Sequence, residues 1–152
     1  MKHIADLFAR IFLSFIFLYE AYDSIIYFEA TKVKMSEYGL TGNQDLMLRA
    51  AIVLLIIGGL LLLSGYRSSF GVVLLLIYWV PVTFIVHPFW VESQDCMVSV
   101  SCFERVEEYR RIQGILFMKN LAIIGGLLMV WVNGSGRYSI KRLFATTKVP
   151  NV

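Results

Sequence analysis

Long apolar stretches, separated by polar connections, run through the whole chain. Four of them lie near 4–28, 46–64, 70–86 and 112–132. Each is close to the length of about 20 mostly apolar residues that an α-helix needs to cross a lipid bilayer. The pattern predicts an all-α, multi-pass membrane protein. We expect a single domain built as a bundle of four transmembrane helices, arranged as two helical hairpins.

The composition supports a membrane location, and the residue types present exclude several kinds of cofactor site. Hydrophobic residues make up 58% of the chain and charged residues 16%, whereas charged residues reach about 25% in soluble domains. The two histidines, His3 and His87, lie towards opposite faces of the predicted bundle, which excludes a haem held by two histidines of one chain. The sequence contains no iron–sulfur cysteine run, nucleotide-binding loop or nucleophile elbow. We therefore expect no metal, no covalent cofactor and no nucleic-acid partner.

The connection at 87–111 contains both cysteines of the chain, Cys96 and Cys102. A close pair in one loop favours a disulfide formed in an oxidising compartment; a redox-active pair and two free thiols are the alternatives. Lysines and arginines do not orient the bundle, because six flank each side of the membrane. The disulfide interpretation places 29–45, a polar loop, and 87–111 on the outer side of the membrane and both termini in the cytoplasm. The basic tail, 133–152, then lies on anionic lipid or docks a partner protein.

A double glycine occurs in two of the predicted helices. Ile56–Leu61 recurs as Ile123–Leu128, which suggests that the two hairpins are related by a weak parallel repeat; recurrence through apolar composition alone is the alternative. Small side chains let helices approach closely, and two of them stand four residues apart on one face of the last helix. The residues predicted to serve helix packing are Gly58, Gly59, Ala122, Gly125 and Gly126.

Ionisable residues interrupt the first and last predicted helices at similar depth. With a rise of about 1.5 Å per residue, Glu20 lies about 12 Å, Asp23 about 7–8 Å and Lys119 about 10 Å inside the same membrane boundary. An ionisable group in hydrocarbon is costly unless it has a partner or a function. We therefore predict that Lys119 forms an ion pair with Glu20 or Asp23 inside the bundle.

Other polar and aromatic side chains complete this intramembrane group. Asn120 follows Lys119, His87 lies at the boundary of the third helix, and Tyr78 and Trp79 lie deeper on that helix as candidate ligand-lining residues. Three interpretations stay open. The group is an ion pair that fixes the helix register, a lining for a small amphipathic ligand such as a quinone headgroup or a lipid, or a path for protons or a solute.

Three segments resemble the DoxX family of small, four-span bacterial inner-membrane proteins. They are Gly58–Arg67, His87–Trp90 and Phe117–Leu128, the last with its lysine and asparagine inside a predicted helix. The resemblance covers nearly the whole chain. Relatives often carry a lysine near the end of the first helix, where this chain has Asp23 and Ser24.

The resemblance implies an inner-membrane four-helix bundle with both termini in the cytoplasm. The family takes its name from a subunit of a thiosulfate:quinone oxidoreductase. We therefore expect an accessory or quinone-contacting subunit of a membrane redox assembly; whether it catalyses a reaction itself stays open. Its partners would be the bilayer and other membrane subunits or a second copy. A non-enzymatic, chaperone-like assembly component is the first alternative, and a small-solute transporter is the second.

Overall fold

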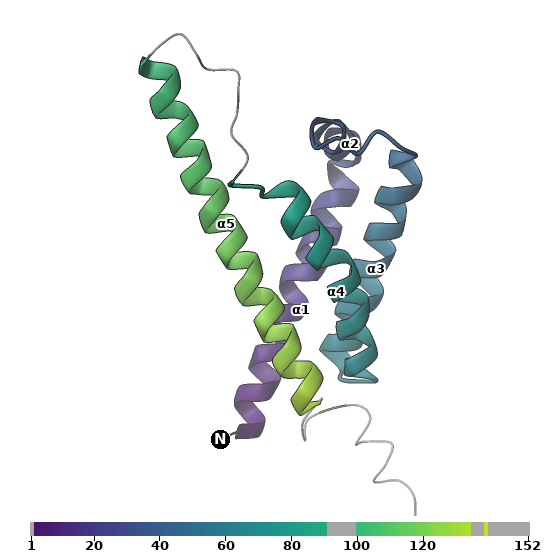
Figure 1. Cartoon of the computed structure of the whole chain (residues 1–152). Helices are drawn as coiled ribbons and strands as arrows, with labels where there is room; N and C mark the ends of the chain where they lie inside the picture. The colour runs from purple at the N-terminus through teal and green to yellow at the C-terminus, as the bar shows by residue number, and fades with distance from the viewer. Residues whose placement is uncertain (1, 91–99, 135–138, 140–152) are drawn as a thin grey trace, which may run out of the picture.

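The computed structural model describes residues 2–90, 100–134 and 139 (Figure 1). Within these ranges the chain forms five helices and no strand: α1 (Lys2–Ile26), α2 (Phe28–Glu37), α3 (Gln44–Ser64), α4 (Ser68–Val86) and α5 (Val100–Asn133). The four long helices correspond to the four apolar stretches of the sequence. The all-α prediction is therefore confirmed for the described part of the chain.

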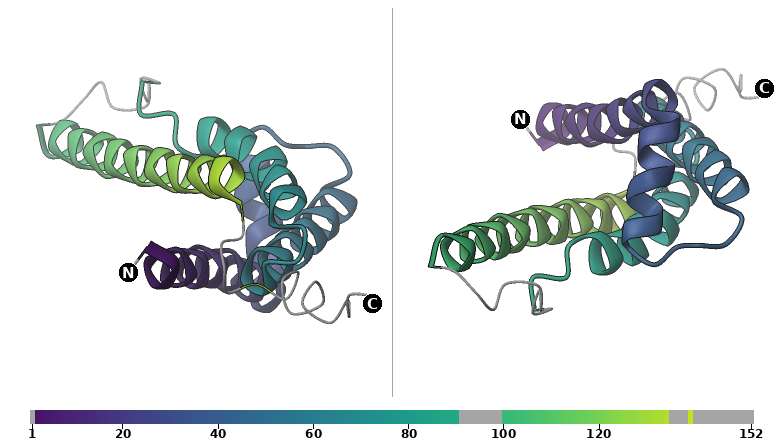
Figure 2. Two further views of the ribbon diagram at one scale, coloured as in Figure 1. Left: turned by 90° about the horizontal axis from the view of Figure 1, so that it is seen from below. Right: turned by 90° about the horizontal axis from the view of Figure 1, so that it is seen from above.

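The long helices pack in chain order. α1 packs on α3, α3 on α4 and α4 on α5, whereas α1 and α5 touch at few positions. End views show α1 and α5 as two arms that project from the side formed by α3 and α4 (Figure 2). The arms meet where Leu13 of α1 lies 3.3 Å from the position that a Cβ on Gly126 of α5 would occupy.

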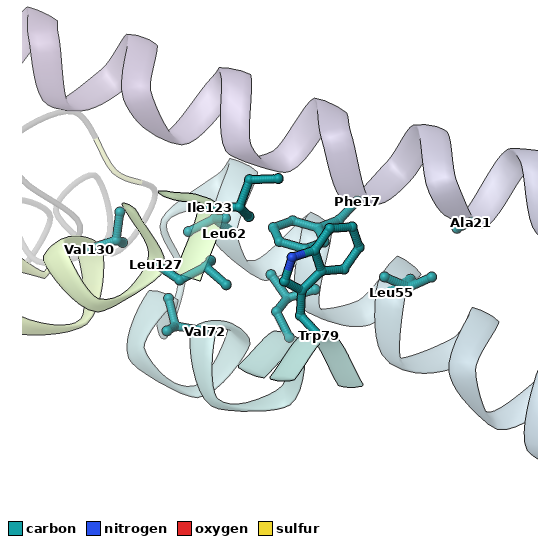
Figure 3. Close-up of a cluster of buried hydrophobic side chains, with 10 residues drawn as sticks. Phe17, Ala21, Leu55, Leu62, Val72, Trp79, Ile123, Leu127 and Val130 are labelled. Carbon is teal, nitrogen blue, oxygen red and sulfur yellow. The ribbon is translucent and has the colours of Figure 1, made fainter. Parts of the chain in front are cut away.

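An apolar core lies between the four long helices. It includes Phe17 of α1, Leu55 of α3, Trp79 of α4 and Leu127 of α5 (Figure 3). Many other large apolar side chains are exposed on the outer sides of the helices. An exposed apolar surface of this extent is costly in water and favourable in lipid.

Three helices qualify as membrane spans. α3, α4 and the 106–133 part of α5 are long and apolar enough to cross a bilayer. α1 has 25 residues and therefore the necessary length. Its ionisable residues, Asp6, Arg10, Glu20 and Asp23, reduce its apolar character. The described chain is therefore a membrane protein with three candidate spans, where the sequence predicts four.

A tight turn makes α3 and α4 antiparallel neighbours, as its length in the sequence predicts. α3 ends at Gly65, whose φ of 67° lies in the left-handed region that favours glycine. Nearby, the two backbones approach closely, since a Cβ on Gly71 would lie 3.0 Å from the carbonyl oxygen of Gly58. The absence of side chains at these two positions therefore allows the close spacing of α3 and α4.

The connection 29–45, predicted as a polar loop, contains the helix α2 instead. Its glutamate, alanine, lysine and methionine residues favour a helix, and this local preference explains the difference. Lys32 of α2 forms ion pairs with Glu29 at 2.9 Å and with Asp45 of α3 at 3.0 Å. α2 lies across one end of the bundle (Figure 1), which we call the α2 end.

The other end of the bundle buries a charged side chain. Arg10 is 1% exposed, and its Nε lies 3.8 Å from Oδ2 of Asp6, as the four-residue spacing predicts. Its guanidinium also lies against Gly65, where a Cβ would stand. Ser139 is also buried beside Gly65, and its Cβ lies 2.8 Å from the Cβ position of Gly65. The basic tail over 133–152 otherwise lies mostly outside the described residues, so its role stays a prediction.

α5 extends well beyond the apolar stretch that predicted it. It begins at Val100, so the second half of the connection at 87–111 is helical. Cys96 and the side chain of Cys102 lie outside the described residues. The disulfide between them therefore stays a prediction.

Candidate functional site

Ionisable side chains from four helices gather towards the α2 end of the bundle. Their centre is Glu20 of α1, which is partly buried. The groups within electrostatic range of its carboxyl are Asp23 of α1, Lys34 of α2, Tyr78 on α4, His87 at the end of α4, and Lys119 of α5. The structure thus brings together the residues that the sequence placed at similar depth. We call Glu20, Asp23, Tyr78, His87 and Lys119 the polar cluster.

Lys119 and the two acids lie near one another without direct contact. No ion pair joins Lys119 to Glu20 or Asp23 in the described part of the chain, so the predicted direct pair is absent. The reason is the rotation of α5 about its axis. Asn120 takes the buried position, at 3% exposure, and Lys119 lies one residue around the helix on the exposed side. A long lysine side chain at the edge of a bundle keeps its charge at lower cost than a buried one.

A stripe of buried residues at heptad-like spacing runs along α5. Its members are Gln113, Phe117, Asn120, Ile123, Leu127 and Val130, which are spaced three or four residues apart. Nδ1 of His87 lies 2.6 Å from Oε1 of Gln113, and because this oxygen only accepts, the imidazole donates the hydrogen bond. Gln113 was not among the residues expected from the sequence. Its spacing of seven residues from Asn120 is the signal that points to it.

The segment His87–Trp90, which follows α4, packs against α5. The rings of Phe89 and Trp90 lie 5.3 and 5.6 Å from the ring of Phe117. Phe84 of α4 lies 5.4 Å from the same ring. Edge-to-face contacts of this kind contribute about 0.5–1.5 kcal/mol each beyond area burial. The segment is therefore a contact between helices, in addition to the aromatic interface belt that its sequence indicates.

Trp79 of α4 lies in the core next to the polar cluster. Its ring packs edge-to-face on Phe17 of α1, with centroids 5.0 Å apart, and it lies beside the ring of Tyr78. The side chain is 5% exposed, yet its Nε1 has no hydrogen-bond partner in the described part of the chain. Phe17 precedes Glu20 by three residues, so the two side chains lie about one helical turn apart along α1.

α2 connects α1 with α5 at this end. It follows α1 almost directly, and its C-terminal neighbour Tyr38 lies beside Tyr109 of α5. Burial and the neighbouring Tyr109 hydroxyl raise the pKa of Tyr38, so this phenol stays neutral well above physiological pH. Lys34 of α2 adds a positive charge within range of Glu20. The polar cluster is therefore bounded by α2 on one side and by the contact between α1 and α5 on the other.

The chemistry of the polar cluster follows from its side chains. Within the described ranges, no three histidine, cysteine or acidic side chains lie close enough together to hold a metal ion. The Lys119 ammonium and the Tyr78 hydroxyl donate hydrogen bonds, and the Glu20 and Asp23 carboxyls accept them or hold protons. The aromatic rings of α4 add flat apolar surface. Such a set suits a small molecule that carries hydrogen-bonding oxygens on an apolar ring.

The residues predicted for helix packing fall into two groups. Gly58, Gly59 and Gly126 lie at helix contacts, where a Cβ would come within 2.6, 3.0 and 3.3 Å of a side chain on another helix. Gly125 has no atom of another helix within 4 Å of its Cβ position, and Ala122 is exposed. Both therefore lack a packing partner within the described chain, although they belong to the same small-residue motif.

Comparison with known proteins places this architecture in a family. The model of the DoxX family matches residues 5–88, which is more than half of the 152 residues and includes α3, α4 and nearly all of α1. Inner membrane protein YqjF of Escherichia coli (strain K12) is 28% identical over 146 residues, which cover 94% of this chain and 96% of that protein. No solved structure matches the chain. Together with its apolar helices, these matches identify a multi-pass protein of the bacterial inner membrane. The chain belongs to the DoxX family.

Proposed function

We propose that this protein is a quinone-contacting, accessory subunit of a membrane redox assembly, and that the polar cluster receives the quinone headgroup. The observation that carries the proposal is the gathering of Asp23, Tyr78, His87 and Lys119 around the Glu20 carboxyl. Intramembrane ionisable groups are kept where they have a partner or a function. Lys119 has no direct ion pair within the described chain, so an ion pair that fixes the helix register does not account for the ionisable groups of the polar cluster.

The chemistry of a quinone complements this cluster. Its carbonyl oxygens accept hydrogen bonds, its ring is flat and apolar, and its tail is soluble in lipid. Lys119 and Tyr78 would donate to the oxygens, and Glu20 would hold or release a proton near them. Lys119 lies on the exposed side of α5, so the headgroup would reach it from the bilayer without first crossing the core.

The proposal includes a topology of four spans with both termini in the cytoplasm. α1 supports this as a fourth span, because its charged side chains Arg10 and Glu20 are turned inwards while its aromatic side chains other than Phe17 face outwards. The exposed aromatic residues of α1 are Phe8, Phe12, Phe15, Tyr19 and Tyr22. The α2 end would then face the periplasm, where a disulfide between Cys96 and Cys102 can form.

Thiol labelling of intact cells tests this orientation. A membrane-impermeant reagent should label Cys96 and Cys102 only after a reductant has been added, without lysis. Labelling without a reductant would contradict the disulfide, and labelling that requires lysis would reverse the topology.

Quinone binding tests the function. The purified protein in mild detergent should bind decylubiquinone stoichiometrically, and Glu20→Gln and Lys119→Met should each weaken this binding. Glu108→Gln is the matched control, because it neutralises an exposed carboxylate on α5 away from the cluster. The proposal fails if the wild-type protein binds no quinone, or if all three variants bind it like the wild type.

One observation favours a second candidate, a non-enzymatic assembly component. The exposed small residues Ala122 and Gly125 leave a face of α5 that a helix of another subunit would fit closely. In that case a defined larger complex should co-purify from gently solubilised membranes, and decylubiquinone should not bind. Gly125→Leu should then disrupt the complex, and neither the wild-type protein nor this variant should bind decylubiquinone.

A further inference from the structure

The indole N–H of Trp79 is a buried hydrogen-bond donor without an acceptor in the described part of the chain. Nearby buried hydroxyls do not share this condition. Thr83 donates to the carbonyl oxygen of Trp79 at 2.7 Å, and Ser14 donates to that of Arg10 at 2.6 Å. Because buried polar groups are nearly always hydrogen-bonded, an orphaned donor whose neighbouring buried hydroxyls are satisfied points to a group that binds there from outside the chain.

The position of this donor relates it to the polar cluster. The nitrogen lies on the side of the indole that is turned towards Ile123 and Leu127 of α5 (Figure 3). Ile123 lies four residues after Lys119 on α5. Phe17, on which the indole packs, lies three residues before Glu20 on α1. The donor and the polar cluster are therefore about one helical turn apart, or about 5.4 Å along the helix axes.

The contacts between α1 and α5 bear on access to the donor. α1 and α5 share few contacts. Along both helices the contact between Leu13 and Gly126 comes on one side of the Trp79 position and the polar cluster comes on the other side. A separation of α1 from α5 on the polar-cluster side of this contact would break few of the contacts between these two helices.

We propose that Trp79 is a ligand-binding residue that donates a hydrogen bond to the deep carbonyl of a para-quinone, while the opposite carbonyl lies at Glu20 and Lys119. The inference rests on the proposed function and adds the orientation of the ring. A para-quinone carries hydrogen-bond acceptors on opposite sides of one ring, so one headgroup can reach two groups that lie at different depths in the bundle. The edge of Phe17 then borders the ring, and the tail leaves between α1 and α5.

The test compares two ligands in two variants of the full chain. Trp79→Phe retains an aromatic ring beside Phe17 but lacks the donor; Trp131→Phe, which changes an exposed tryptophan on α5, is the control. Binding of decylubiquinone should weaken about 2- to 10-fold in Trp79→Phe, as expected for one neutral hydrogen bond, and should be unchanged in Trp131→Phe. Decylbenzene has the same tail and no carbonyl, so its binding should be equal in both variants.

A second measurement does not depend on how well Trp79→Phe folds. In a chain with Trp90→Phe and Trp131→Phe, Trp79 is the only tryptophan. Its emission should be quenched in step with decylubiquinone binding and should not respond to decylbenzene.

The outcomes separate the two proposals. If the wild-type protein binds no decylubiquinone, the proposed function and this inference fail together. If it binds, and Glu20→Gln weakens the binding while Trp79→Phe leaves it unchanged, the proposed function stands and the role of Trp79 is refuted. An equal loss of decylbenzene binding in Trp79→Phe would refute it as well, because the effect would then arise from packing.

Discussion

Replacing Gly71 by alanine should disrupt a close approach between α3 and α4. A Cβ at this position would lie 2.8 Å from Cβ of Leu61, 3.0 Å from the carbonyl oxygen of Gly58 and 3.3 Å from the backbone nitrogen of Leu62. Carbon atoms in favourable contact are about 3.5–4.0 Å apart. Two of the three obstructing atoms belong to the backbone of α3, so no side-chain rotation relieves the overlap, and α3 and α4 must move apart.

The expected magnitude has two parts of opposite sign. Overpacking of this kind costs about 1–3 kcal/mol, while exchanging glycine for alanine inside a helix contributes about 1 kcal/mol of helix preference. Gly125→Ala isolates the second part, because Gly125 lies within α5 and has no atom of another helix within 4 Å of its Cβ position. The free energy of unfolding of Gly71→Ala should therefore fall about 1–3 kcal/mol below that of Gly125→Ala.

Equilibrium unfolding in mixed micelles, with increasing sodium dodecyl sulfate and helicity as the signal, measures this difference. Both variants should retain native helicity before the transition. If the two free energies of unfolding agree within about 0.5 kcal/mol, the size of an ordinary surface substitution, the close backbone approach of α3 and α4 is refuted.

Two further predictions concern the ends of the bundle. Gly65→Ala should lower the free energy of unfolding by about 2–5 kcal/mol, because alanine is strained at the φ of 67° and its Cβ would meet the guanidinium of Arg10. Gly39→Ala, with a φ of 78° and open space around its Cβ position, should lower it by only about 1–2 kcal/mol. Equal losses in the same unfolding titration would contradict this account. The hydrogen bond that Lys32 donates to Glu29 is the largest cause that raises the pKa of Lys32, so its stabilising effect should be complete below the ordinary lysine pKa of about 10.4 and disappear as the pH rises through the higher folded-state value. Lys32→Met should therefore lower the melting temperature slightly at neutral pH and leave it unchanged in strong alkali; a deficit that persists there would point to lost packing instead.

The sequence predicted helices most reliably where the apolar pattern was long. The ends of α3 and α4 agree with the predicted stretches to within two residues, because an apolar stretch in lipid must satisfy its backbone hydrogen bonds within one helix. α2 was missed, since a ten-residue polar segment has no apolar periodicity; its residues favour a helix locally, and its position against α3 includes the ion pair between Lys32 and Asp45. This contact joins residues far apart in the pattern, so a local reading does not detect it.

The candidate site shows the same division between what is local and what is not. The depth of Glu20 and of Lys119 follows from counting residues along a helix of known rise, and the structure places both within electrostatic range of each other. The direct ion pair did not follow, because it depends on how α5 is rotated. Adjacent residues point about 100° apart on a helix, and this rotation buries Asn120 and exposes Lys119.

The sequence by itself determined which long apolar segments form helices, that this is a membrane protein, and which ionisable groups lie at similar positions along the helices. These properties depend on composition and on distance along a helix axis. Only the tertiary structure decided which neighbours meet around those axes: that Gly126 contacts α1 while Gly125 does not, that Gln113 accepts a hydrogen bond from His87, and that the N–H of Trp79 is left without an acceptor in the described chain. The physical reason is that helix rotation and helix pairing are set by the fit of many side chains at once, and no single segment contains that information.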